Sequence, residues 1–221
     1  EIYFRASRKD RPEKVTASFR QTGRHPELWN PVNGEQRDLP NFKIENGRTS
    51  IPLEFDPNGS MFVVFRKSTT ATAGQGSNFP SFKTVQTLEG PWTVQFDKEW
   101  FYPSTGLTGE AAEGKLVFEK LEDWSKRPED AVKHFSGTAT YRKKFPVSAL
   151  PSPGSKLFLD LGTVGETAKV TLNGKDLGVL WCGPRRVEIT EALKAGENEL
   201  KIEVVNNWPN RLIGVGARRC I

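Results

Sequence analysis

The chain has 221 residues, of which 36% are hydrophobic and 10% aromatic, and it carries a formal net charge of +5 with a pI near 9.2. This length is enough for one large or two small domains with buried cores. The basic excess is mild and dispersed, so we predict a solvated surface and no nucleic-acid partner, and the lack of a run of about 20 apolar residues predicts no membrane insertion.

The first 67 residues predict a small antiparallel β-sandwich module. Residues 15–20 and 49–55 alternate apolar and polar side chains, which is the period of a strand buried on one face. Residues 60–65 are mostly apolar and predict a strand buried on both faces. Asn-Gly pairs at 33–34 and 46–47 predict tight turns, because both residue types tolerate positive φ.

A change of composition follows at residues 68–78. This stretch has no large apolar residue and is rich in Ser, Thr and Gly, so it predicts a linker. The predicted organisation is therefore a β module over 1–67, a linker over 68–78 and a second domain over 79–221.

The second domain is predicted to be a β-sandwich of the jelly-roll kind with one short helix, which makes the fold class all-β. Short alternating segments separated by Gly- and Asn-rich turns are typical of such folds. The predicted strands are 92–96, 116–118, 138–145, 156–161, 168–172, 186–189 and 200–205. Residues 103–115 predict a long loop, and Pro128 with the acids after it predicts a helix over 127–135.

The sequence predicts no catalytic residues in this chain. His134 has Asp130 four residues before it on the predicted helix, a spacing that favours an ordinary surface contact over a catalytic triad. Glycoside hydrolysis needs two acids that face the scissile bond. The closely spaced acids lie in polar stretches and predict surface carboxylates: Glu110, Glu113, Glu122, Asp123, Glu129 and Asp130.

Tryptophans next to turns are the more specific signal. Indole rings offer an apolar face to the C–H face of a sugar, and neighbouring Asn and Arg side chains supply directional hydrogen bonds to hydroxyl groups. The candidate carbohydrate-binding residues are Trp181, Arg185, Trp208, Asn210 and Arg211. The alternative is that each Trp fills an open end of the sandwich and that Arg211 caps backbone carbonyls.

The sequence predicts no cofactor and has no spaced set of metal ligands. A structural Ca²⁺ bound by loop carbonyls and one carboxylate leaves no sequence signature, so this alternative stays open. Cys182 and Cys220 permit either one disulfide that pins the C-terminal tail or two free thiols.

Three segments resemble the galactose-binding-like jelly roll of glycoside hydrolases, called the sugar-binding domain in family 2. They are FSGTATYRKKF (135–145), LFLDLGTVGETAKVTLNGKDLGVLW (157–181) and RRVEITEALKAGENELKIEVVNNWPNRLIG (185–214). With PELWNPVNGEQRDLP (26–40) and TSIPLEFDPNGSMFVVFRK (49–67), the chain is similar to the C-terminal part of bacterial family 106 enzymes, the α-L-rhamnosidase-like proteins.

This resemblance implies a periplasmic or extracellular enzyme that degrades a plant-type, rhamnose-containing polysaccharide. Its catalytic acids would lie in an upstream (β/α) barrel of the same polypeptide, with this chain as a non-catalytic accessory. A single Met, absent from position 1, fits a piece of a longer protein. Val215 stands where the family has an Asp, which puts a ligand or ion site there in doubt. The alternative function is a structural or protein-interaction domain that binds no sugar.

Overall fold

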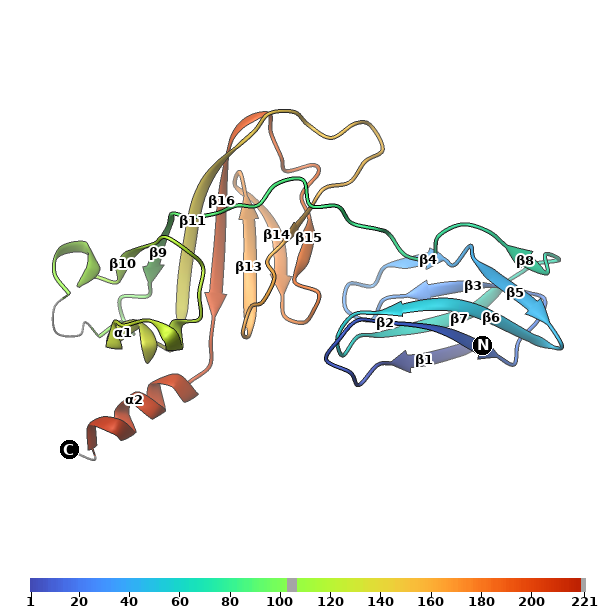
Figure 1. The fold of residues 1–221 in the computed structure, drawn as a ribbon, viewed down its shortest axis with the longest axis horizontal. Helices are drawn as coiled ribbons and strands as arrows, with labels where there is room; N and C mark the ends of the chain where they lie inside the picture. Colours follow the sequence, from blue (N-terminus) through green and yellow to red (C-terminus); the bar gives the residue numbers. More distant parts are fainter. Residues whose placement is uncertain (103–106, 220–221) are drawn as a thin grey trace. The chain divides into compact units, whose positions relative to one another are not determined.

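The protein is described by a computed structural model that covers residues 1–102 and 107–219. It divides into two compact units, Glu1–Val85 and Gln86–Ile221 (Figure 1). The described strand pairs are antiparallel, so the all-β prediction is confirmed. None of the described helices has the length and apolar character needed to span a membrane.

The first unit is a sandwich of two four-stranded sheets. One sheet has the order β1 (Ile2–Ala6), β7 (Ser60–Ser68), β3 (Arg24–Trp29) and β4 (Gln36–Asp38). The other has the order β2 (Glu13–Phe19), β6 (Arg48–Phe55), β5 (Phe42–Glu45) and β8 (Ala73–Gly74). Phe19 and Ile51 from one sheet and Phe65 from the other belong to one buried cluster, so the core lies between the sheets.

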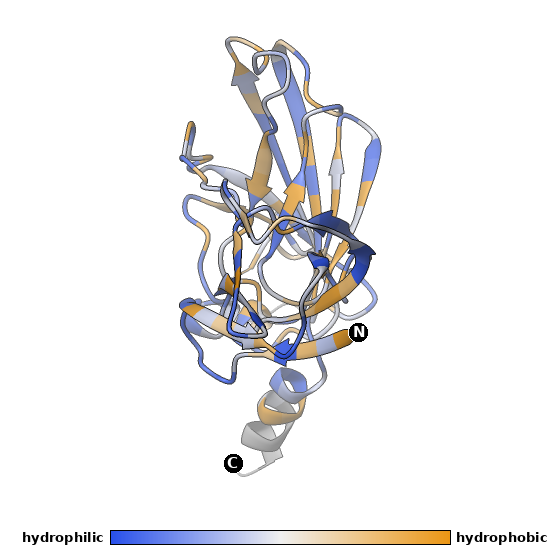
Figure 2. Ribbon diagram, turned by 90° about the vertical axis from the view of Figure 1, so that its right-hand side faces the viewer, coloured by the Kyte–Doolittle hydropathy of each residue, from blue (hydrophilic) through white to orange (hydrophobic). Residues whose placement is uncertain are grey.

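Local patterns explain how this unit folds. Along β6 the side chains of Thr49, Ile51, Leu53 and Phe55 are buried and alternate with less buried ones, as the period of two requires, and Figure 2 shows such alternation along many strands. The Asn46–Gly47 pair between β5 and β6 has φ angles of 51° and 72°. Both residues are left-handed, which confirms the turn predicted from this Asn-Gly pair.

Residues 68–78, predicted as a linker, lie inside the first unit. Strand β8 pairs with β5. The side chain of Asn78, which is 5% exposed, accepts a hydrogen bond from Asn41 N and donates to Asn41 O and Pro52 O. A polar stretch can therefore belong to a core when its hydrogen bonds are satisfied there. That residues 1–67 and 79–221 are the folding modules stays a prediction.

The second unit contains a six-stranded sheet and a two-stranded sheet. The order in the larger sheet is β10 (Lys115–Phe118), β9 (Trp92–Phe96), β11 (Thr138–Val147), β16 (Gly196–Val205), β13 (Thr167–Leu172) and β14 (Lys175–Leu180). Strands β12 (Phe158–Asp160) and β15 (Arg186–Glu188) form the smaller sheet. Ile189, after β15, shares a buried cluster with Val170 and Ile202 of the larger sheet.

Helices differ most from the prediction. The helix expected over 127–135 is reduced to α1 (Asp130–Lys133), preceded by the 3₁₀ turn η2 (Trp124–Lys126). Within the loop predicted over 103–115, residues 103–106 lie outside the described residues and Gly109–Ala111 form the 3₁₀ turn η1. The C-terminal helix α2 (Pro209–Arg219) was not predicted.

Candidate functional site

Segments that carry the candidate residues leave the larger sheet of the second unit from one end. Val205, the last residue of β16, pairs with Thr138 and Thr167, the first residues of β11 and β13. Leu180, the last residue of β14, pairs with Ala168. The segments that follow β16 and β14 therefore leave the sheet at the same end (Figure 1). Strand β13 lies between them, so their starting points are roughly 10 Å apart at the usual strand spacing.

An aromatic cluster with one arginine lies after β16. The rings of Trp100 and Trp208 meet edge to face with centroids 5.3 Å apart. The Arg211 guanidinium lies 4.4 Å from the ring centroid of Tyr102 and 5.6 Å from that of Trp100. Its Nη1 also donates a hydrogen bond to the backbone oxygen of Trp100, at 3.2 Å. We call Trp100, Tyr102, Trp208 and Arg211 the aromatic cluster.

Phe101 positions the two aromatic residues that flank it in the chain, Trp100 and Tyr102. Its ring is buried and stacks on that of Phe96 with centroids 5.5 Å apart. The flanking Trp100 and Tyr102 are 39% and 53% exposed. The buried Phe101 ring therefore fixes the backbone at this position, so that the exposed Trp100 and Tyr102 side chains lie at the end of the sheet.

Hydrogen bonds fix the backbone that carries Trp208 and Arg211. Ser136 Oγ donates to Asn207 O and accepts from Arg211 N, at 2.9 and 3.1 Å. Asn206 donates through Nδ2 to Phe135 O and accepts from Gly137 N. The first turn of α2 is therefore tied to the segment after α1, which limits the movement of the aromatic cluster.

Trp181 and Arg185 form a separate part of the same sheet end. Trp181 is 58% exposed, and Arg185 Nη2 donates to the backbone oxygens of Val164 and Glu166, at 3.3 and 2.7 Å. Arg185 Nη1 is buried and, among the described residues, has no hydrogen-bond partner. No ring or polar contact within residues 1–102 and 107–219 joins this pair to the aromatic cluster.

The remaining candidates are placed as follows. Asn210, expected on a loop, lies half-buried in the first turn of α2. Val215 lies on α2, but its side chain is outside the described part, as is Cys220. Cys182 is a half-buried free thiol. A free Cys182 contradicts the disulfide alternative. The effect of Val215 stays a prediction.

Four of the six acids considered for hydrolysis form ion pairs with nearby Lys or Arg side chains. Glu110 pairs with Lys115 and Glu113 with Lys98, at 2.8 and 2.6 Å. Arg127 binds both Glu122 and Glu129, at 2.9 and 2.7 Å. Burial raises the pKa of Glu129, but its hydrogen bonds with Arg127 outweigh burial and hold that pKa below its ordinary value. Glu129 is therefore suited to ion pairing rather than to donating a proton.

Metal-binding groups and triad geometry are absent from the described parts of the site. Among the described residues no cluster of three or more His, Cys, Asp or Glu side chains could hold a metal ion. His134 Nδ1 lies 3.7 Å from Asp130 Oδ1, while Ser136 Oγ bonds to backbone atoms. The alternative of a structural Ca²⁺ bound by loop carbonyls and one carboxylate stays open.

Sequence reasoning missed Trp100 and Tyr102. The three consecutive aromatics at 100–102, next to a loop rich in Gly and Glu, were the available signal. The sequence does not show which of these three aromatic rings is buried in the core and which are exposed. In the structure Phe101 is buried and its two neighbours are exposed.

Residues 92–213 match the family described as Glycosyl hydrolase 2 galactose-binding domain-like. This match covers more than half of the chain and includes all five candidate residues. The chain belongs to the glycosyl hydrolase 2 galactose-binding domain-like family.

Two relatives, one of them similar over nearly the whole chain, complete the comparison. The structure of a rhamnosidase from Novosphingobium sp. PP1Y is 36% identical with a TM-score of 0.83, and the match covers 96% of this chain and 19% of that chain. A putative beta-glucuronidase from Formosa agariphila is 45% identical over 128 residues, which are 58% of this chain and 10% of that protein. The chain thus spans a fifth or less of either relative's length.

Proposed function

We propose that this chain supplies non-catalytic accessory β-domains to an exported glycoside hydrolase of the family 106, α-L-rhamnosidase-like kind. The likeness to a rhamnosidase over 96% of the chain carries this proposal. That relative is about five times longer than the matched part, so it has room for a separate catalytic domain. The partner of these domains is then the catalytic domain of the same polypeptide, which acts on a rhamnose-containing plant-type polysaccharide.

We further propose that the aromatic cluster binds a saccharide of that polymer. Trp208 and Tyr102 are 56% and 53% exposed, so both can offer ring surface to the C–H face of a sugar. Arg211 is already held by Trp100 O, so its orientation is set before a ligand arrives and little conformational entropy is lost on binding. Trp181, Arg185 and Asn210 provide further contacts along the same sheet end.

Affinity electrophoresis in gels containing rhamnogalacturonan tests sugar binding. Trp208→Ala removes one stacking face and is expected to weaken retardation about five- to tenfold. Phe4→Ala is the matched control, since Phe4 in the first unit has nearly the same exposure, 55%, and lies outside the cluster. Equal retardation of the wild type and Trp208→Ala would contradict the proposed site.

A second function, docking of the catalytic domain, is favoured by one observation. Leu212 and Ile213, next to the aromatic cluster on α2, are 65% and 64% exposed. Neighbouring exposed apolar side chains of this kind are typical of interaction surfaces. Replacing both by Ser should leave polysaccharide retardation unchanged if the cluster binds sugar, and should weaken association with the catalytic domain if α2 docks it.

A further inference from the structure

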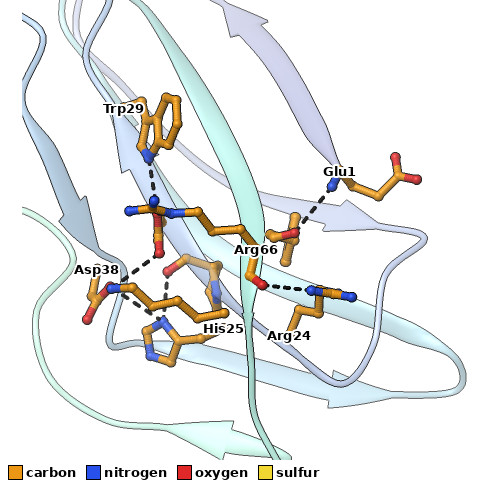
Figure 3. A network of polar contacts seen from close by, with 10 residues as sticks. Glu1, Arg24, His25, Trp29, Asp38 and Arg66 are labelled. Atoms are coloured by element: carbon orange, nitrogen blue, oxygen red, sulfur yellow. Dashed lines mark hydrogen bonds and ion pairs between the residues drawn. The ribbon is translucent and has the colours of Figure 1, made fainter.

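A polar pocket lies on the first unit, where β3, β4 and β7 run side by side (Figure 3). Glu27 of β3 pairs in register with Asp38 of β4 and with Val64 of β7. The pocket has a volume of about 230 Å³. Its lining residues are Glu27, Gln36, Arg37, Asp38, Arg66 and Lys67.

A buried carboxylate forms the floor of this pocket. Glu27 is 1% exposed, and its Oε2 accepts hydrogen bonds from Trp29 Nε1 at 3.1 Å and Arg66 Nε at 2.8 Å. Among the described residues, Oε1 has no hydrogen-bond partner, although Lys67 Nζ lies 3.2 Å away. Burial raises the pKa of Glu27, but the bonds from Arg66 and Trp29 and the nearby Lys67 outweigh it and hold the pKa below the ordinary value.

Stability alone is a poor reason for this arrangement. A buried ion pair costs desolvation energy, and well-packed apolar side chains of similar volume often stabilise a protein as well or better. Both oxygens of Glu27 face cations, Oε2 at 2.8 Å from Arg66 Nε and Oε1 at 3.2 Å from Lys67 Nζ. The buried carboxylate therefore holds the Arg66 and Lys67 side chains in place above it, ready for a ligand.

Charged side chains form the rim. Arg66 and Lys67 are 55% and 52% exposed, and Asp38 accepts from Lys67 Nζ at 2.7 Å. Within the described part of the chain, the Arg66 guanidinium donates only through Nε, which leaves both of its Nη groups for a ligand. Arg37 is fixed as one wall, because its Nη1 donates to Asn78 O and its guanidinium lies 5.1 Å from the ring centroid of Phe79.

We propose that this pocket binds one sugar residue that carries a carboxylate, a uronic acid. Of the described lining side chains, Arg66 keeps two Nη groups without a hydrogen-bond acceptor, and these charged donors favour an anion over a neutral sugar. The planar Arg66 fork matches a carboxylate, while the Asp38 carboxylate, whose side chain is 53% exposed, accepts from sugar hydroxyls. The volume lies below the roughly 300–1,000 Å³ of pockets for drug-sized ligands, which limits the occupant to a single ring.

The Trp29 indole N–H reports on this site directly, because it donates to Glu27. We would titrate the ¹⁵N-labelled 221-residue chain with galacturonate, galactose and acetate and follow this resonance, assigned with Trp29→Phe. Galacturonate is expected to shift it saturably, galactose to bind about tenfold more weakly, and acetate to give no saturable shift. Equal binding of galactose, saturable binding of acetate, or no saturable shift with galacturonate would each overturn the proposal.

Two variants and one control test the roles of the side chains. Arg66→Lys keeps the charge but loses the fork and should weaken galacturonate binding about tenfold. Gln36→Ala removes an exposed lining side chain and should weaken binding without unfolding the unit. Lys14→Ala, which breaks an exposed ion pair with Glu54 outside the pocket, should leave the affinity unchanged. Wild-type affinity in both pocket variants would overturn the proposal.

This inference does not rest on the proposed function, because its residues belong to the other unit. Trp208→Ala should leave the galacturonate-dependent shift of Trp29 unchanged, and Arg66→Lys should leave polysaccharide retardation by the aromatic cluster unchanged. A changed Trp29 shift in Trp208→Ala, or changed retardation in Arg66→Lys, would contradict the proposal that the two sites bind independently.

Discussion

Asn198 and Trp124 are buried side chains of the second unit whose polar atoms have specific partners. Asn198 is fully buried, and its Oδ1 accepts from Lys194 N while its Nδ2 donates to Lys194 O and Gly196 O. Trp124 Nε1 donates to the buried hydroxyl of Tyr141. Such residues restrict the fold to one arrangement, because a shift in register would leave each of these groups unsatisfied.

Tyr141 gives a pH-dependent prediction. Burial raises the pKa of Tyr141, and the hydrogen bond from Trp124 and the charge of Arg127 lower it. Burial has the larger effect, so the pKa rises from 10.0 to about 12. The folded state therefore disfavours the phenolate, and this contribution to stability is complete below pH 10 and is lost as the pH rises toward 12. Phenolate absorbance should show a late step near pH 12 in the wild type.

The Tyr141→Phe variant is the test of that assignment. The late step should disappear, and the free energy of unfolding at neutral pH should fall by about 1–3 kcal/mol because Trp124 Nε1 loses its acceptor. Persistence of the late absorbance step in this variant would show that another tyrosine is responsible.

Helix α2 is held at its place by a close backbone approach. Gly214 lies against His134, and a Cβ added at Gly214 would come within 2.7 Å of His134 Cβ. Pro209 and the glycines at 214 and 216 are typical of turns, which is why the sequence did not predict a helix there. The packing requirement at Gly214 outweighs its poor helix propensity.

The Gly214→Ala variant tests whether close packing or helix propensity matters more at this position. Alanine raises intrinsic helix stability by about 1 kcal/mol, whereas the steric overlap with His134 costs roughly 1–3 kcal/mol. We expect α2 to move away from α1, with a change in Trp208 fluorescence and weaker polysaccharide retardation. Gly165→Ala is the control, since a Cβ there meets no atom within 4 Å. Unchanged fluorescence in Gly214→Ala would contradict the close packing of α2.

The whole molecule is two β-sandwich units, and the boundary between them is testable. Residues beyond 67 complete the first unit through β8, Asn78 and Phe79, which packs against its core. The second unit contains its own large core. We propose that each unit folds by itself when the boundary follows these contacts.

Fragments 1–85 and 1–67 should therefore differ in stability. Fragment 1–67 lacks the three hydrogen bonds of Asn78 and the packing of Phe79, so its free energy of unfolding should be lower by about 2–4 kcal/mol. Urea denaturation followed by circular dichroism measures this difference. Equal midpoints for the two fragments would support the original prediction of a linker over 68–78.

Local patterns were enough to predict the all-β class, the Asn46–Gly47 turn and the surface character of the acids. These features depend on a period of two, on tolerance of positive φ and on polar surroundings, all of which lie within a few residues. Trp208 and Arg211 were also candidates from sequence, because aromatic and polar side chains beside a strand end are a local signal.

Only the tertiary structure decided which side chains meet. Arg211 bonds to Trp100 O across 111 positions, and Arg66 bonds to Glu27 across 39, so neither contact leaves a local pattern. Strand order and register bring these residues together, as they bring β8 into the first sandwich. The sequence alone determined the kind of fold because its strands are locally encoded, whereas both proposed sites depend on long-range pairing.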